Sequence, residues 1–380
     1  MLSSVDGNEP HYNSSDNGGI VCHTFKNGLA KVQIDGKYGF LNKTGQMAIE
    51  CQYDYATDFI EGISIVRKGQ FYGYIALDGT EITMQEFEHL EPFTQGIGLF
   101  KKDGKFGFMD TTGKVIIENK LEYAQSFEGD YALFQKNNKY GFLNRQGIEV
   151  IPSSFDFALN FTEELAPVFS KGEWIYVNTK GKKAFDQVFD KAANFFESRA
   201  TVSINGHAAI IDKKGNVLTK EVYEDIKAFE NGFAIFKKKG SYGIMDKDGL
   251  ELFSGVNDLR SSSSSLYPFR NSHLWGFMNA KGEVIVEPIY TKVGEFNDGF
   301  ASVAVDQKVG YISSLGKIVV PLFYEKAHDF RDGKAFVSKG NKYYLISIND
   351  IDNVEIDIME ILLNAREYNL VKEDLALMLD

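Results

Sequence analysis

Hydrophobic and polar residues alternate along this chain as in β-strands, and the alternation recurs every 34 residues. In the first unit Ala30, Val32 and Ile34 fall on one face of a strand. The pair Asp35-Gly36 follows and favours a tight hairpin, because both residues tolerate a positive φ. Further strands are expected at 38–41 and 47–49. A period of 34 also occurs in helical arrays, but amphipathic helical spacing is missing from these units, so each is predicted as three antiparallel strands.

Three columns of residues keep this period. Aromatic-glycine pairs occur at Tyr38-Gly39, Tyr72-Gly73, Phe106-Gly107, Tyr140-Gly141, Tyr242-Gly243 and Trp275-Gly276. Phenylalanine recurs at 25, 59, 93, 127, 161, 195, 229, 296 and 330, with Ser262 in the gap. Glycine recurs at 45, 79, 113, 147, 181, 215, 249, 282 and 316. The last two columns shift together by one residue, which places a deletion between Gly249 and Ser262.

The first unit resembles the WG repeat, also called the KWG repeat, of bacterial proteins. The resemblance is carried by the segment Lys37-Tyr38-Gly39-Phe40-Leu41-Asn42, then Gly45, Ile49 and Tyr53-Asp54, and it extends over residues 20–347. It implies a β-repeat fold and says little about activity, because the family carries no agreed catalytic residues. Units that depart from the pattern have Trp174-Ile175, Ala208-Ala209, Val309-Gly310 and Tyr343-Tyr344.

The expected fold class is an all-β repeat array of about ten three-stranded antiparallel units in an open superhelical stack. A closed propeller-like ring is the alternative, since 34 residues is short for a four-stranded blade. Residues 1–19 are expected to be disordered or extended, and 20–349 to form the array, with a weak joint near 255–270. Residues 350–380 are expected to be an acidic α-helical segment.

The period fails in two places, which are therefore the candidate partner-binding regions. In the first, Asn257 replaces the corner aromatic and Ser262 replaces the phenylalanine. This region is either a hinge or docking loop, with candidate contacts Ser261, Ser265 and Arg270, or a tolerated surface loop. In the second, helical spacing predicts one helix that includes the candidate contacts Val354, Ile358, Ile361 and Leu362, and another near 371–379. These helices would cap the array or dock a partner.

The net charge of −12 disfavours nucleic-acid binding, because an acidic surface repels phosphates. Acidic residues follow most corner positions, in a column formed by Asp54, Glu88, Glu122, Asp156, Asp190, Glu224, Asp258, Thr291 and Glu325. This column is either a binding strip for cations or basic partners, or a set of carboxylates that each accept backbone N–H bonds in their own turn. The second interpretation is favoured because Asp and Glu interchange freely.

No catalytic, cofactor-binding or metal-binding residues can be assigned. The chain lacks phosphate-loop and nucleophile-elbow motifs, and Cys51 is expected to be a core residue rather than a nucleophile. We therefore expect a non-enzymatic protein-protein interaction scaffold. The alternatives are a glycan or small-molecule binding protein, whose ligand would stack on aromatic residues, and a regulatory subunit of an enzyme complex. Without a signal peptide or an apolar membrane span, a bacterial cytoplasmic location with no membrane partner is expected.

Overall fold

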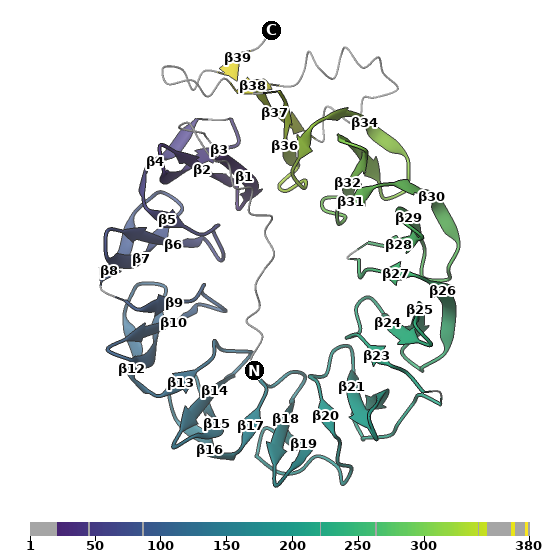
Figure 1. Ribbon diagram of the computed structural model, residues 1–380. Coiled ribbons are helices and arrows are strands. Elements are labelled where there is room, and N and C mark those ends of the chain that lie inside the picture. Colours follow the sequence, from purple (N-terminus) through teal and green to yellow (C-terminus); the bar gives the residue numbers. More distant parts are fainter. Residues whose placement is uncertain are drawn as a thin grey trace.

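The chain folds into ten small antiparallel sheets arranged around a ring (Figure 1). The computed structural model describes residues 21–44, 46–85, 87–220, 222–262, 264–340, 342–347, 366–368 and 377–378. Numbered along the chain, sheet 1 comprises β1–β4 and sheet 10 comprises β35–β39. The expected all-β repeat array is confirmed, and it resembles a ten-bladed β-propeller.

Each sheet begins with a strand on the inner side of the ring, followed by two long strands that form a hairpin. The inner strands are β1 Val21–Lys26, β5 Tyr55–Ala56, β9 His89–Leu90, β13 Tyr123–Ala124, β17 Phe157–Ala158, β20 Lys191–Ala192, β23 Asp225–Ile226, β27 Asp258–Leu259, β31 Lys292–Val293 and β35 Lys326–Ala327. The first hairpin strands are β2 Leu29–Ile34, β6 Ile63–Lys68, β10 Ile97–Lys102, β14 Tyr131–Lys136, β18 Leu165–Ser170, β21 Arg199–Ile204, β24 Phe233–Lys238, β28 Tyr267–Asn271, β32 Phe300–Val305 and β36 Lys334–Lys339. The second are β3 Lys37–Asn42, β7 Phe71–Ala76, β11 Lys105–Asp110, β15 Lys139–Asn144, β19 Glu173–Asn178, β22 His207–Asp212, β25 Ser241–Asp246, β29 Leu274–Met278, β33 Lys308–Ser313 and β37 Lys342–Ser347.

Most sheets end with a strand at the outer rim of the ring (Figure 1). The rim strands are β4 Met47–Tyr53, β8 Glu81–Gln85, β12 Val115–Leu121, β16 Glu149–Phe155, β26 Glu251–Val256, β30 Val284–Tyr290 and β34 Ile318–Tyr324. The prediction of three strands per unit was therefore wrong by one strand. It missed the inner strands, because most of them are two residues long and too short to show an alternation of hydrophobic and polar residues.

The glycine of the aromatic-glycine pair is required by the rim strand, which bulges against it. A Cβ atom on Gly39 would lie 2.5 Å from the carbonyl oxygen of Ile49, and one on Gly141 would lie 2.6 Å from that of Ile151. The pairing register between the second hairpin strand and the rim strand shifts at this point, as expected for a β-bulge. Only a residue without a side chain leaves room for this close approach.

Sheets without this glycine pair differently at the rim. Ile175 and Ala209 replace it in sheets 5 and 6, and both sheets have three strands. Their outer segments are held instead by isolated bridges, such as that between Trp174 and Phe189. In sheet 10, where Tyr344 replaces the glycine, the next strand is the distant β38 Arg366–Tyr368. Val309-Gly310 keeps the glycine, and sheet 9 keeps its rim strand β34.

The core lies between neighbouring sheets, where the phenylalanine column packs. Phe59 and Phe161 are 2% and 4% exposed, and each packs on a ring from the preceding sheet. The ring centroids of Phe40 and Phe59 are 4.7 Å apart, and those of Phe142 and Phe161 are 4.5 Å apart. The turn-glycine column serves the same joints, because Gly147 has a φ of 75° and lies against Ile117 of the preceding sheet. Both columns therefore set how one sheet follows the next.

The ring is closed by direct contacts between the first and last sheets. The rings of Phe25 and Phe336 stack with centroids 5.6 Å apart. Asp332 Oδ2 accepts a 2.6 Å hydrogen bond from the backbone N–H of Gly28, and Lys43 Nζ lies 3.9 Å from the same oxygen. The expected open superhelical stack was therefore wrong, and the alternative closed ring is observed. Each unit turns far enough for sheet 10 to reach sheet 1, a turn that the sequence pattern alone does not reveal.

The C-terminal helices are not confirmed. The described residues beyond 347 form β38 and β39 Leu377–Met378, which extend sheet 10. The candidate contacts Val354, Ile358, Ile361 and Leu362 lie outside the described residues, as does the predicted N-terminal segment 1–19. Among the described residues, no helix is long and apolar enough to cross a membrane.

Candidate functional site

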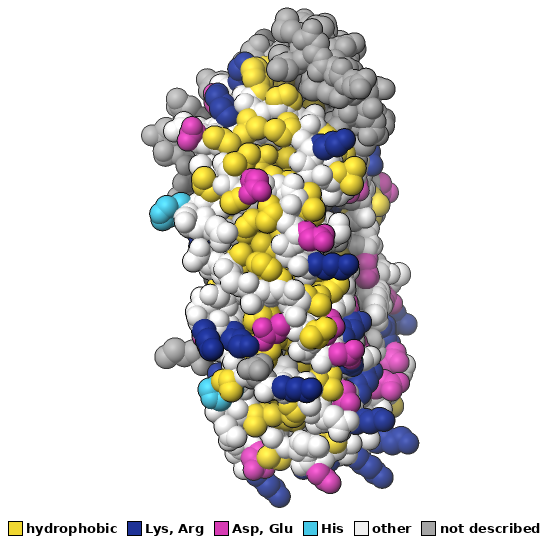
Figure 2. All heavy atoms as spheres, turned by 90° about the vertical axis from the view of Figure 1, so that its right-hand side faces the viewer, with side chains coloured by type: hydrophobic (Ala, Val, Ile, Leu, Met, Phe, Trp, Pro, Cys, Tyr) yellow, Lys and Arg dark blue, Asp and Glu magenta, His cyan; other side chains and the backbone are white. Residues whose placement is uncertain are grey.

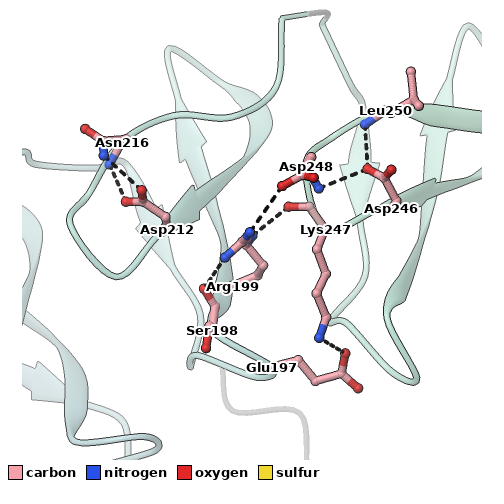
Figure 3. A network of polar contacts seen from close by, with 9 residues as sticks. All are labelled: Glu197, Ser198, Arg199, Asp212, Asn216, Asp246, Lys247, Asp248 and Leu250. Atoms are coloured by element: carbon pink, nitrogen blue, oxygen red, sulfur yellow. Dashed lines mark hydrogen bonds and ion pairs between the residues drawn. The ribbon is translucent and has the colours of Figure 1, made fainter.

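A polar network at the joint between sheets holds the ring together (Figure 3). Glu197, in the turn before β21, accepts a 2.7 Å hydrogen bond from the backbone N–H of Gly232 in the next sheet. Lys247 Nζ lies 2.9 Å from the same carboxylate, and its hydrogen bond is the main cause of the lowered pKa of Glu197. Arg199 donates a 2.6 Å hydrogen bond to the carbonyl of Lys247. These contacts are structural, because they join the turn of Glu197 in sheet 6 to the turns of Gly232 and Lys247 in sheet 7.

The same arrangement recurs at other joints, which we call carboxylate latches. In each latch a turn carboxylate accepts the N–H of the corresponding turn in the next sheet. Latches are formed by Glu61 with Gln95 and Gly96, Glu163 with Ser198, Glu197 with Gly232, Asp298 with Gly333, and Asp332 with Gly28. Ring closure thus uses an interaction that also joins sheets inside the chain.

The acidic column accepts backbone N–H groups, as the favoured interpretation expected. The donors, however, are in hairpin turns 15 or 16 residues further along the chain and not in the turn of each carboxylate. The pairs are Asp54 with Gly69, Glu88 with Gly104, Glu122 with Asn137, Asp156 with Lys171, Asp190 with Gly206, Glu224 with Gly240, and Glu325 with Gly340. The pKa of Asp54 is lowered chiefly by its hydrogen bond with Lys37 and then by that from Gly69. The alternative of a cation-binding strip loses its support, because these oxygens already have donors.

The assignment of this column at sheet 8 was wrong by one residue. Val256 pairs with Tyr242 at the corner, and Asn257 Oδ1 accepts the N–H of Ser272 at 3.1 Å. Asn257 therefore occupies the acidic position, and Asp258 is the next residue. The deletion lies before Val256, closer to Gly249 than the column shift alone could place it.

The predicted partner-binding serines lie beside the joint between sheets 7 and 8, where the phenylalanine of the column is missing. Ser261 and Ser265 are exposed, while Ser262 is buried and its hydroxyl lies 3.0 Å from that of Ser264. Leu266 is 3% exposed and joins the core cluster of Phe277 and Phe296. That cluster lies between sheets 8 and 9, whereas the missing phenylalanine belongs to the joint of sheets 7 and 8. There Tyr267, 5% exposed, packs in the core cluster of Ile244 and Phe269.

Arg270, the third predicted contact in this region, belongs to a cation-π cluster. Its guanidinium pairs with Asp258 at 2.9 Å and lies 5.2 Å from the ring centroid of Trp275. The exposed Arg260 stacks on the same ring at 3.8 Å and donates to the carbonyl of Val293 at 3.4 Å. The Nη2 atom of the partly exposed Arg270 is paired with Asp258, while its buried Nε has no hydrogen-bond partner among the described residues.

Reactive groups offer little chemistry in the described part of the chain. Burial raises the pKa of the Cys51 thiol to about 11, so this group is protonated at neutral pH. Burial also lowers the pKa of His328, next to Lys326. The described residues contain no group of three or more His, Cys, Asp or Glu side chains that could hold a metal ion.

A row of partly exposed aromatic rings crosses sheets 3 to 5, and we call it the aromatic ladder. Its rings are Phe106, Tyr123, Tyr140, Phe157 and Trp174, each 17 residues after the one before. Successive ring centroids are 5.8, 6.2, 5.2 and 5.8 Å apart, mostly in edge-to-face geometry. The rings alternate between second hairpin strands and inner strands. The ladder is therefore a continuous row of aromatic rings that passes from one sheet to the next.

A cavity of about 370 Å³ adjoins the ladder at Tyr123. It lies between sheets 3 and 4, and Asn160 of sheet 5 completes its wall. Gln125 Nε2 donates to the Tyr123 hydroxyl at 2.9 Å, and Ser126 Oγ donates to Glu91 Oε2 at 2.5 Å. The buried Asn160 Oδ1 has no hydrogen-bond partner among the described residues. The cavity thus combines one aromatic wall with several polar groups.

The outer rim carries an apolar patch over sheets 7 to 9. Figure 2 shows a hydrophobic band running along this side of the ring. The rim patch comprises the exposed side chains of Leu250, Val284, Ile285, Ile289, Leu315 and Ile318. Apolar patches of this kind mark interaction surfaces on soluble proteins.

A family model described as the WG containing repeat matches nine segments of the chain. They are residues 21–38, 38–70, 72–106, 106–140, 140–174, 176–206, 210–242, 275–308 and 310–343. The chain belongs to the WG-repeat family. The matched segments omit 243–274, the unit that contains the deletion and the serine run. The glycine of the WG repeat is thus the residue that admits the rim strand.

Several solved structures resemble the WG-repeat ring at low sequence identity. A eukaryotic initiation factor is 12% identical with a TM-score of 0.49, covering 84% of this chain and 98% of that one. Hsv2p of Kluyveromyces lactis is 10% identical with a TM-score of 0.35, covering 60% and 92%. The tricorn protease is 11% identical with a TM-score of 0.28, covering 88% and 47%. No curated protein sequence matches the chain. None of these likenesses bears on function.

The ladder and the latches were not predicted from the WG-repeat columns, although each corresponds to a regular spacing in the sequence. The ladder is visible as a 17-residue spacing that pairs each aromatic-glycine ring with the inner strand that follows. The spacing continues after Trp174 with Lys191, Ala208 and Asp225, so the aromatic row ends at sheet 5. The latch carboxylates share one column with Asn27 and Gln95. Its mixture of acidic and amide residues hid their common role.

Proposed function

We propose that this WG-repeat protein is a non-enzymatic scaffold that binds another protein through the rim patch. The observation that supports it is the exposure of six apolar side chains on adjoining sheets. Leu250, Ile289 and Leu315 are 62%, 53% and 74% exposed. Propeller-like repeat folds usually mediate protein interactions, which agrees with this use of the ring.

The partner is expected to present an apolar side-chain surface, not an extended strand. Pro288 in β30 and Pro321 in β34 have no backbone N–H, so these rim strands make poor templates for strand addition. Docking by side chains leaves the rim strands unchanged. Ser261, Ser265, Arg270 and the C-terminal residues stay predicted contacts, and the bacterial cytoplasmic location stays a prediction.

The test is site-specific photo-crosslinking in the cells that make the protein. A photoreactive residue at Ile289 should yield a discrete cross-linked partner, whereas one at Ile148 should not. Ile148 is a matched control, because it is 60% exposed and lies just before the rim strand of sheet 4, away from the rim patch. The double substitution Ile285→Lys and Ile289→Lys should abolish co-purification of that partner, and Ile148→Lys should leave it intact. Equal cross-linking at both positions would contradict the proposal.

A second candidate function is ligand binding on the surface formed by the aromatic ladder. It is favoured by the aromatic ladder, whose rings stay partly exposed, while the phenylalanine column is buried. The ladder lies in sheets 3 to 5 and the rim patch in sheets 7 to 9, so the two functions use different residues.

A further inference from the structure

The aromatic ladder is a run of five rings in contact in sheets 3 to 5. His89 separates it from Tyr72, Tyr55 and Tyr38, which hold the preceding positions of the 17-residue spacing. At the next positions in the 17-residue spacing, Lys191, Ala208 and Asp225 stand in place of rings. None of the ladder rings is fully buried, although five contiguous aromatic rings could bury much apolar surface. A limited aromatic strip that stays in contact with water is typical of a surface that a ligand covers.

The cavity at Tyr123 supplies the polar half of such a site. Tyr123 is both a ladder ring and part of the cavity wall. The bond from Gln125 fixes the position of its hydroxyl. Asn160 Oδ1, buried in the same wall, has no partner in the described part of the chain, which is unfavourable for an acceptor. A ligand that donates a hydrogen bond here would satisfy it.

The charges around the cavity disfavour an anionic ligand. Glu91 and Glu128 line it and repel anions. Arg145 lies behind the wall, donating to the carbonyl of Gly129 at 2.8 Å and lying 5.7 Å from the ring centroid of Phe127. Arg145 Nε lies 3.6 Å from Asp130 Oδ1, so its positive charge only partly offsets the carboxylates of the lining. A hydrogen-bonding but uncharged molecule fits this balance.

We propose that the cavity and the aromatic ladder bind a neutral oligosaccharide. One sugar ring lies in the cavity, with its C–H face on Tyr123 and a hydroxyl donating to Asn160 Oδ1. Further sugars follow the ladder over Tyr140 and Phe157 towards Trp174. Sugar hydroxyls both donate and accept hydrogen bonds, which matches the mixed set formed by Glu91, Gln125 and Asn160. This inference does not depend on the rim patch.

The experiment is binding of the full chain to an array of neutral, anionic and cationic glycans, followed by calorimetry with the strongest neutral oligosaccharide. Tyr123→Ala and Asn160→Ala should each weaken binding about tenfold or more, since each removes a direct contact. Tyr242→Ala is the control, because Tyr242 in sheet 7 occupies the strand position of Tyr140 and lies outside both the ladder and the cavity. It should leave the affinity unchanged. Phe157→Ala should weaken binding of a hexasaccharide more than of a disaccharide.

A second readout keeps the proposal testable if an alanine variant folds poorly. Trp174 and Trp275 are the two tryptophans of the chain, and Trp275 is 5% exposed. The bound oligosaccharide should therefore shift the fluorescence of the Trp275→Phe protein, which retains Trp174. The proposal is overturned if no neutral glycan binds, if charged glycans bind best, or if the Tyr123 and Asn160 variants bind as tightly as the parent. The cross-linking at Ile289 is unaffected by any of these results.

Discussion

The carboxylate of Asp332 accepts a 2.6 Å hydrogen bond from the backbone N–H of Gly28, which lies 304 residues earlier in the chain. Glu197 makes the corresponding bond to Gly232, only 35 residues away. Lys43 and Lys247 approach the two carboxylates in the same way. Ring closure therefore reuses the contact that joins neighbouring sheets, and the C-terminal unit continues into the N-terminal one.

Asp332→Ala should weaken closure by roughly 1–2 kcal/mol, because it removes a charge-assisted hydrogen bond that is partly open to solvent. Hydrogen exchange should become faster in β1, β2 and β36, on both sides of the closing joint. Asp298→Ala removes the same bond to Gly333 at an internal joint. It should increase exchange only in sheets 9 and 10. Unchanged protection of β1 and β2 in the Asp332 variant would show that the latch does not hold the ring closed.

Gly141→Ala should destabilise the protein by roughly 2–3 kcal/mol, since the added methyl group meets the backbone of the rim strand β16. The free energy of unfolding in urea measures this effect. Ala209→Gly, at the corresponding position of sheet 6, should cost only about 0.5–1 kcal/mol through added chain flexibility. If Gly141→Ala were as mild as Ala209→Gly, the bulged rim strand would not be the reason for the glycine.

Cys51 should react slowly with thiol reagents while the protein is folded. Burial raises its pKa from 9.0 to about 11, so the reactive thiolate is scarce below that pH. In the Cys22→Ser background, alkylation followed by mass spectrometry should give an apparent pKa near 11 in the folded chain. The chain in denaturant should give a value near 9.0.

The same shift makes a stability contribution with a definite sign. Below pH 9 the thiol is protonated in both states, and its contribution to folding is complete. Between pH 9 and 11 the unfolded chain loses the proton first, so this contribution is lost as the pH rises. Cys51→Ala should therefore reduce the decrease in stability over this interval. A folded-state reactivity profile equal to that in denaturant would contradict both statements.

Leu266→Ala should destabilise the protein by roughly 2–4 kcal/mol, because Leu266 is buried against Phe277 and Phe296. Thermal or urea unfolding would measure the loss. Leu315→Ala is the matched control, as Leu315 is 74% exposed and should change stability little. An equally small effect at Leu266 would mean that the joint between sheets 8 and 9 is loosely packed.

Much of the fold could be predicted from the sequence, because the repeat columns report local requirements. The alternation in 29–34 and the turn at Asp35-Gly36 correctly gave the hairpin of β2 and β3. The buried phenylalanine column was also predicted as core. Ring closure could not be predicted, because it depends on a small rotation between sheets that no single column encodes.

The candidate surfaces were harder to foresee than the fold. The ladder depends on Tyr123 and Tyr140 being neighbours across two strands, and Tyr123 lies in a strand too short to recognise from pattern. The cavity needs Glu91, Tyr123 and Asn160 from three sheets, so it exists only once the sheets are in place. The serine run drew attention because it breaks the period, yet Tyr267 in the structure packs in the core cluster of the joint that lacks the phenylalanine.

The closing latch between Asp332 and Gly28 has a consequence for where the chain can begin. A linear array unfolds most easily from its exposed ends, whereas a ring whose last joint resembles the others has no end from which to fray. The position of the chain ends then does not determine how the sheets are arranged. A circularly permuted chain that starts at the exposed Lys180, in the turn after β19 and outside the latches, and joins the present ends by a flexible linker should rebuild the same ring.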